Sequence, residues 1–192
     1  GLKMCDRGLK PQVITSHYGL PRLRKGGLVV EITDGDAFYY RGSFMYDLVK
    51  TTAIRMAFGL SQELAGRGVH AVAVTPGFLR SEWMLAHFGV TEANWRDAVA
   101  KSREFAASET PLFVGRCIAA MAADPEISKR NGRVYASWDL ATDYKVNDAD
   151  GTRPHFRNWL EANMPEVAAG WKRLDEKFYS YWTKTPFTPP GE

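Results

Sequence analysis

Two short apolar runs separated by a long helical pattern leave this chain few folds to adopt. The β-branched run at 28–33 follows a Gly-Gly pair and predicts a strand, and the run at 69–74 predicts a second one. Between them, the apolar spacing from about 44 to 65 predicts a helix, with Ser43 as its N-cap. A strand, a helix and a strand with short links are typical of a right-handed parallel crossover. The sequence therefore predicts an α/β fold.

The flanking segments extend this pattern on both sides. A helix disturbed by Pro11 and ended near Pro21 is expected over 4–24. Beyond the second strand, 79–107 predicts an irregular helical region that resembles a lid, and another helix is expected to begin at Pro111. A third strand is expected at 132–136.

Composition narrows the classes of partner. The 192 residues are 45% hydrophobic and 24% charged, and the net charge is only +3. The basic residues are scattered apart from Arg22, Arg24 and Lys25, so we expect no nucleic-acid partner. No apolar run approaches the roughly 20 residues that span a bilayer, so we expect no membrane partner. The distant Cys5 and Cys117 have no metal-ligand spacing and fit a reducing, cytoplasmic compartment. The four histidines form no close pair, so we expect no metal.

Tyr46 and Lys50 are the pair that suggests chemistry. They are four residues apart on the predicted helix, so their side chains share a face. A lysine about 5 Å from a phenol stabilises the phenolate by about 3 kcal/mol at an effective dielectric of about 20. This lowers the phenol pKa by roughly two units, towards the range where a general base works. The alternative is a core tyrosine beside a surface lysine.

The surroundings of this pair resemble one family. A strand, a loop, a Y-x-x-x-K helix, a strand and a P-G-x-x-x-[ST] turn follow one another from 28 to 81, which resembles the short-chain dehydrogenase/reductase family. The motifs at 108–110, 115–117, 123–125, 137–140 and 148–151 resemble its branch typified by dehydrogenase/reductase member 1. The likeness runs over roughly 6–155 and leaves out the C-terminal tail.

The resemblance implies a Rossmann-like parallel sheet flanked by helices and truncated at the N-terminus. Residues 1–150 would be the C-terminal part of the domain, and 151–192 a C-terminal extension that packs on it or frays from it. The start at Gly1 is typical of a cut chain, and no glycine-rich phosphate loop is found. In the family that loop lies upstream, together with the residues that distinguish NAD from NADP.

The implied activity is hydride transfer between NAD or NADP and a small carbonyl or secondary alcohol. Tyr46 would be the acid/base, and Lys50 would lower its pKa and bind the nicotinamide ribose. Pro76 and Gly77 would open the turn whose following backbone meets the nicotinamide amide. These implied cofactor contacts continue along the turn through Leu79 and Ser81.

Two positions depart from the family pattern. Asp34 takes the place of the substrate-orienting serine, with Thr33 beside it as the alternative hydroxyl. An ionised aspartate cannot donate a hydrogen bond to a carbonyl, so it would have to be protonated, or Thr33 would replace it, or the substrate differs. Asp6 takes the place of an asparagine that holds a water in the family's proton relay. The rival hypothesis is therefore a non-catalytic relative that serves as a binding or oligomerisation module.

Apolar residues predict two further contacts. The helix at 44–65 is apolar on more than one side, which favours a homodimer or homotetramer in the complete protein. The aromatic residues Tyr39, Tyr40, Trp83 and Phe88 flank the expected cleft. They either line a bulky apolar substrate pocket or pack within the loops.

Overall fold

The computed structural model describes residues 1–174 and 178–179. The predicted C-terminal extension therefore lies partly outside the described residues, at 175–177 and 180–192.

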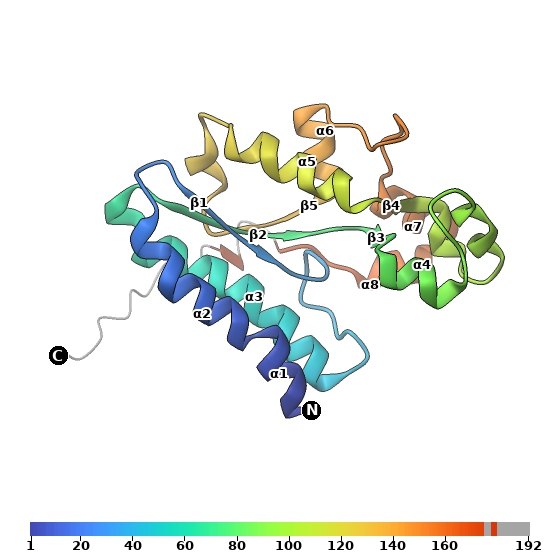
Figure 1. The fold of residues 1–192 in the computed structure, drawn as a ribbon, viewed down its shortest axis with the longest axis horizontal. Coiled ribbons are helices and arrows are strands. Elements are labelled where there is room, and N and C mark those ends of the chain that lie inside the picture. The colour runs from blue at the N-terminus through green and yellow to red at the C-terminus, as the bar shows by residue number, and fades with distance from the viewer. Residues whose placement is uncertain (175–177, 180–192) are drawn as a thin grey trace.

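A three-stranded parallel sheet forms the centre of the molecule (Figure 1). Its order is β1 (Leu28–Ile32), β2 (His70–Thr75) and β5 (Val134–Ala136). Leu28 pairs with His70 and Ile32 with Val74, so β1 and β2 run in register over five residues. The predicted crossover, with adjacent parallel strands, is confirmed.

Helices cover both faces of this sheet (Figure 1). On one face lie α1 (Leu2–Gly8), α2 (Lys10–Gly19) and α3 (Phe44–Glu63), and on the other lie α5 (Pro111–Ala122) and α6 (Ser137–Tyr144). Ser43 has the extended backbone of an N-cap, but its side chain makes no capping hydrogen bond. After η2 (Ala65–Arg67), Gly68 adopts a left-handed φ of 62°, which turns the chain into β2.

The N-terminal helix is broken, as the proline predicted. Leu9 separates α1 from α2, Pro11 sits in the first turn of α2, and the short η1 (Leu20–Arg22) ends the segment. Gly8 lets α1 approach α3 closely, because a Cβ there would come within 2.6 Å of Val49 Cγ1. This contact places α1 beside the first turns of α3.

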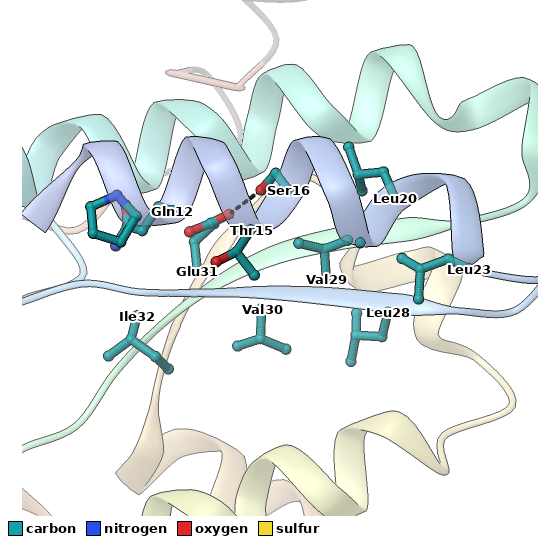
Figure 2. Close-up of a pocket in the computed structure, with 12 residues that line it drawn as sticks. Gln12, Thr15, Ser16, Leu20, Leu23, Leu28, Val29, Val30, Glu31 and Ile32 are labelled. Atoms are coloured by element: carbon teal, nitrogen blue, oxygen red, sulfur yellow. Dashed lines mark hydrogen bonds between the residues drawn. The ribbon is translucent and has the colours of Figure 1, made fainter.

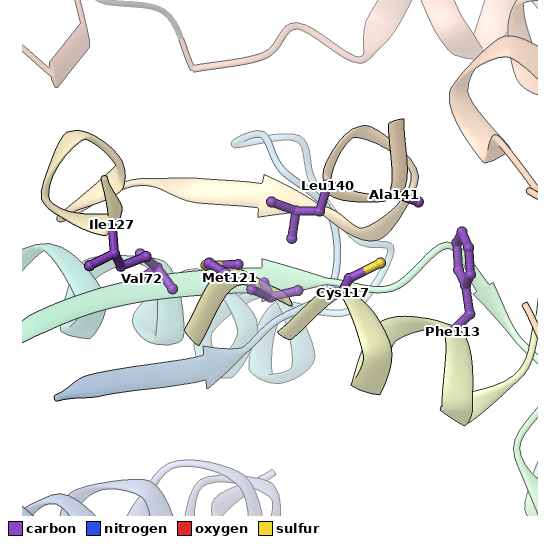
Figure 3. Close-up of a cluster of buried hydrophobic side chains, with 8 residues drawn as sticks. Val72, Phe113, Cys117, Met121, Ile127, Leu140 and Ala141 are labelled. Carbon is purple, nitrogen blue, oxygen red and sulfur yellow. The ribbon is translucent and has the colours of Figure 1, made fainter. Parts of the chain in front are cut away.

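The main core lies between β2 and the α5–α6 face (Figure 3). Full burial of an aliphatic or aromatic side chain contributes about 1.5–3 kcal/mol, so a cluster of this size anchors β2 firmly. The cluster consists of Val72, Val74, Phe113, Cys117, Met121, Ile127, Leu140 and Ala141.

A separate excursion leaves the sheet after β2 and returns to it. It begins at β3 (Phe78–Leu79) and ends at β4 (Ser108–Glu109), which pairs with β3 in parallel. Between them lie α4 (Glu82–Phe88), η3 (Trp95–Ala100) and η4 (Arg103–Ala107), packed around Trp95, Ala98 and Phe105. The expected irregular helical region is confirmed, and its role as a lid stays a prediction.

The remaining described elements are η5 (Ile127–Arg130), α7 (Phe156–Asn163) and α8 (Pro165–Gly170). Within the described ranges, no helix is both long and apolar enough to cross a bilayer.

One edge of the sheet has no strand beside it in the described part of the chain, because β1 pairs only with β2. A groove of about 450 Å³ runs along this edge, between β1 and α2 (Figure 2). Val29 and Glu31 point towards α2. Leu28, Val30 and Ile32 point to the opposite face of the sheet. Ser16 of α2 donates a hydrogen bond to Glu31 Oε1 at 3.4 Å, and burial raises the pKa of this carboxyl.

Candidate functional site

The carboxyl ends of β1 and β2 are joined by one side chain. Thr75 Oγ1 accepts a hydrogen bond from the backbone N–H of Gly35 at 2.7 Å and donates one to the carbonyl of Pro76 at 2.9 Å. The loop after β1 and the turn after β2 therefore meet at the end of the sheet where both strands have their carboxyl ends. In open α/β sheets this end is where ligands bind.

Tyr46, Lys50 and Asp34 come together at that end. Tyr46 lies in the first turn of α3, and its hydroxyl donates a hydrogen bond to Asp34 Oδ2 at 2.8 Å. Lys50, one turn further along, places Nζ 5.6 Å from the centre of the Tyr46 ring. The three residues singled out from the sequence are thus neighbours.

The pKa of Tyr46 moves in the direction opposite to the sequence-based expectation. Burial raises it, and Asp34 raises it further through its charge and its hydrogen bond. A carboxylate that accepts a hydrogen bond from the phenol stabilises the neutral phenol, and its negative charge repels the phenolate. Lys50 faces the ring, so in this arrangement Tyr46 is held as a proton donor.

The hydroxyl of Thr33 has a backbone partner within the fold. Its residue is 1% exposed, and its hydroxyl donates a hydrogen bond to the carbonyl of Lys50 at 2.7 Å. The contact ties the end of β1 to the second turn of α3. Thr33 therefore positions the helix that carries Tyr46, and its role as an alternative substrate contact stays a prediction.

Arg41 fixes the loop that carries Asp34, and sequence reasoning missed it. Its side chain is 2% exposed and pairs with Asp47 of α3 at 2.8 Å. It also donates hydrogen bonds to the backbone carbonyls of Asp34 and Ala37. The signal available in the sequence was a lone arginine between a strand and a helix whose first turn holds an aspartate.

Beneath the turn after β2 lies a second residue that the sequence did not reveal, Glu109. It is 1% exposed, accepts a hydrogen bond from Ser137 Oγ at 2.6 Å, and faces the backbone N–H of Gly77. Burial raises its pKa to about 7. A Cβ on Gly77 would lie 2.9 Å from Glu109 Oε2 and 3.0 Å from Phe156 Cβ, so only glycine fits this turn.

The other predicted cofactor residues follow that turn. Pro76 and Gly77 are half-buried, and Leu79 pairs with Glu109 across the β3–β4 ladder. Ser81 is the N-cap of α4, where its Oγ accepts a hydrogen bond from the N–H of Met84 at 3.3 Å. The roles of these residues towards a cofactor stay predictions.

A cavity of about 500 Å³ opens on the α1 side of Tyr46 and Lys50. Lys3, Arg7 and Gln12 also line it, and Gln12 Oε1 is buried there without a hydrogen-bond partner among the described residues. Basic side chains beside a phenol fit the ribose and phosphate groups of a nucleotide, which are polar and anionic. Asp6 is exposed and does not line this cavity, so its predicted place in a relay is unsupported.

Within the described ranges, no group of His, Cys, Asp and Glu side chains could hold a metal ion.

Known proteins similar to this chain are dehydrogenases and reductases. No family model matches the chain. The chain is 31% identical over 148 residues to dehydrogenase/reductase SDR family member 1 of Homo sapiens, an alignment that covers 75% of this chain and 47% of that relative. The protein of the same name from Mus musculus is 30% identical over the same coverage. The chain thus spans about half the length of these curated relatives.

Two solved structures share the arrangement of strands and helices. A mutant short-chain dehydrogenase/reductase of Serratia marcescens matches with a TM-score of 0.55 at 16% identity, over 70% of this chain and 53% of that one. A Beutenbergia cavernae protein assigned as an NAD(P)-dependent gluconate 5-dehydrogenase, with NADP bound at low occupancy, matches with 0.52 at 24% identity, over 68% and 52%. These likenesses confirm the expected Rossmann-like fold.

Proposed function

This chain belongs to the short-chain dehydrogenase/reductase family, and from that premise we propose that it is the catalytic part of an NAD(P)-dependent oxidoreductase. The substrate is a small carbonyl compound or secondary alcohol. One observation carries the proposal: the Tyr46 hydroxyl, Lys50 and Asp34 meet at the carboxyl end of β1. The relatives similar to this chain carry the names of dehydrogenases and reductases, which supports the same reaction class.

Tyr46 exchanges the proton of the substrate oxygen in this mechanism. During alcohol oxidation, the substrate hydroxyl gives its proton to Tyr46 Oη while the phenol proton passes to Asp34 Oδ2, 2.8 Å away. As the alkoxide electron pair forms the carbonyl, the C–H bond of the same carbon breaks and its hydrogen leaves with the bonding pair as hydride, which a bound nicotinamide would accept. During reduction the hydride and both protons move in the opposite order. Because the phenol never has to lose its proton alone, its raised pKa does not block the step.

A bound nicotinamide would supply the hydride acceptor or donor. Lys50 is the residue of this chain proposed to bind the ribose hydroxyls, and its ammonium would stabilise the negative charge that shifts between Asp34 and the substrate oxygen. The turn at Pro76 and Gly77, held from below by Glu109, would meet the carboxamide, with Leu79 and Ser81 following. Either NAD or NADP is compatible with these residues, and the Beutenbergia cavernae protein was found with NADP.

The complete protein would supply the rest of the nucleotide site. The chain holds no glycine-rich loop and covers about half of its relatives, so we infer that the phosphate-binding half lies in sequence outside it. The exposed apolar residues Phe44 and Leu48 of α3 and Val13, Ile14 and Tyr18 of α2 support assembly into a homodimer or homotetramer. The two free cysteines support a cytoplasmic location.

One observation favours the second candidate, a non-catalytic relative that serves as a binding or oligomerisation module. Asp34 holds Tyr46 as a neutral phenol, which removes the base that the family's reaction ordinarily uses. In such a protein the Tyr46–Asp34 hydrogen bond would only fasten α3 to the loop after β1.

The test measures nucleotide binding and turnover in the complete protein. NAD and NADP are titrated by calorimetry, and a panel of ketones and secondary alcohols is assayed for hydride transfer. Tyr46→Phe should keep nucleotide affinity and lower turnover by about 10²–10⁴-fold. Tyr40→Phe is the matched control, because Tyr40 lies in the loop before α3 and is 66% exposed. Nucleotide binding without turnover would favour the module, and full activity of Tyr46→Phe would refute the mechanism.

A further inference from the structure

An aromatic groove of about 440 Å³ lies between the loop after β1 and the C-terminal helices α7 and α8. Its walls are almost entirely apolar. The side chains that form them are Tyr39, Phe156, Leu160, Met164, Val167 and Trp171. The rings of Tyr39 and Trp171 lie 5.0 Å apart, and those of Phe156 and Trp171 6.1 Å apart, so three aromatic residues shape one concave surface.

Tyr39 connects this groove to the catalytic residues. Its hydroxyl lies against Gly35, the neighbour of Asp34, because a Cβ on Gly35 would come within 2.6 Å of Tyr39 Oη. The guanidinium of Arg41 covers its ring at 4.7 Å and holds it in the loop. Burial and the charge of Asp34 raise the pKa of Tyr39 to about 12, so it stays an uncharged donor. Tyr39 therefore links the groove to the loop that carries Asp34.

The charged side chains that line this groove are acidic. Among the described residues that line the groove, the only charged ones are Glu104 and Glu166, and no lysine or arginine joins them. Asp34 adds a third carboxylate at the reacting end. Arg41 does not offset these charges, because its side chain is 2% exposed and paired with Asp47. A ligand that carries a carboxylate would meet like charge at both ends.

We propose that this groove binds the body of the substrate, and that the substrate is a ring-bearing, apolar alcohol or ketone that is neutral or cationic. The inference rests on the proposed function, because it names the substrate class of the same site. Apolar walls favour a ring system through burial and ring stacking. The acidic rim discriminates against carboxylate-bearing substrates by repulsion, which is specificity through an unfavourable contact.

The first experiment uses the complete protein and compares three probes that share one ring system and carry different charges. They are acetylnaphthalene, its carboxylate derivative and its aminomethyl derivative, with acetone as the small reference. Saturation-transfer NMR and calorimetry give affinities without turnover. Acetylnaphthalene should bind at least about tenfold more tightly than acetone, because its ring system buries much more apolar surface in the groove. The carboxylate derivative should bind about fivefold more weakly than the neutral probe.

The second experiment changes the groove itself. Val167 is 45% exposed on its wall, so Val167→Asp should weaken acetylnaphthalene binding about tenfold or more, and the isosteric Val167→Thr should weaken it less. Leu112→Asp is the matched control, because Leu112 is 59% exposed on α5 and lies outside the groove. Glu166→Gln should reduce the difference in affinity between the neutral and the carboxylate probes. Glu63→Gln, at the end of α3, should leave that difference unchanged.

The outcomes separate this inference from the proposed function. Equal or tighter binding of the carboxylate probe, or unchanged binding by both Val167 variants, overturns the assignment of the groove, even if the enzyme turns over other ketones. If the expected binding pattern appears but no probe is reduced and no product alcohol is oxidised, the groove assignment stands and the oxidoreductase proposal fails. Thermal melting checks that each variant, Val167→Thr included, is folded before its affinity is compared.

Discussion

Asp34 and Glu109 are two acids at the same end of the sheet, and their surroundings differ sharply. Asp34 is half-buried in a loop, and its partner is the hydroxyl of Tyr46. Glu109 is 1% exposed in β4, and its partners are Ser137 and the backbone of the turn after β2. An acid that a substrate can approach can take part in chemistry, whereas an enclosed one can only shape its surroundings. In the proposed mechanism the β1 side of the site therefore takes part in proton transfer, and the β2 side holds the turn in shape.

The largest expected effect is on stability, and it tests whether the two acids differ in kind. At about pH 5, Glu109→Ala should lower the free energy of unfolding by about 3–5 kcal/mol, because it leaves a cavity and unpaired buried donors. Asp34→Ala should change it by about 1 kcal/mol or less, since water can reach the groups left behind. Urea unfolding of both variants measures this, and equal losses would remove the distinction.

The pH dependence of stability sharpens the comparison next. Burial raises the pKa of Glu109 from 4.5 to about 7, so the folded state favours its protonated form. The resulting stability is fully present below pH 4.5 and is lost as the pH rises through about 7, an effect of about 3 kcal/mol. Glu109→Gln keeps the shape without the charge and should abolish this loss. Melting temperatures from about pH 4 to 8 compare the two proteins, and parallel curves would contradict the prediction.

The smallest expected effect on stability, and the most specific for chemistry, comes from Asp34→Asn. The amide oxygen can still accept the Tyr46 hydrogen bond, so the free energy of unfolding should change by about 1 kcal/mol or less. Removing the negative charge should lower the pKa of Tyr46, because the carboxylate no longer repels the phenolate. Ultraviolet titration of the phenol detects this shift directly, with Tyr46→Phe as the blank. An unchanged titration curve would show that Asp34 does not control Tyr46.

Asp34→Ser extends this test to activity, because it restores the hydroxyl that the family ordinarily has at this position. Faster carbonyl reduction would show that Asp34 is a substitution within an otherwise ordinary site. Loss of activity would support the proton relay from Tyr46 to Asp34. The pH–rate profile distinguishes the two, since the serine variant has no carboxylate to receive the phenol proton.

The sequence predicted the parts of this molecule that depend on local patterns. The β-branched runs identified β1 and β2, and the spacing of Tyr46 and Lys50 predicted that they share one face of α3. The resemblance to the family also predicted that Asp34, 12 positions before Tyr46, lies at the same site. Each of these features is set within a few turns of backbone.

The features that the sequence missed depend on contacts between distant segments. The distance between Tyr46 and Lys50 along a helix could be predicted, but not that the phenol would donate to Asp34, so the direction of its pKa was wrong. Glu109 contacts the turn at Gly77 across more than 30 positions, through a parallel ladder that no local pattern announces. The hydrogen bond from the Thr33 hydroxyl to the Lys50 carbonyl likewise becomes visible only after folding.

The excursion between β3 and β4 starts and ends at the same short ladder. Arg80 closes its base by donating hydrogen bonds to the carbonyl of Ser108 at 2.8 Å and to its hydroxyl at 3.0 Å. Since its two ends are fixed to each other and its own small core fills the interior, the segment between them can lengthen or shorten without disturbing the sheet. Each doubling of such a loop costs only about 0.6 kcal/mol of closure entropy. The length and sequence of this segment can therefore change during evolution while Tyr46 and Lys50 stay in place.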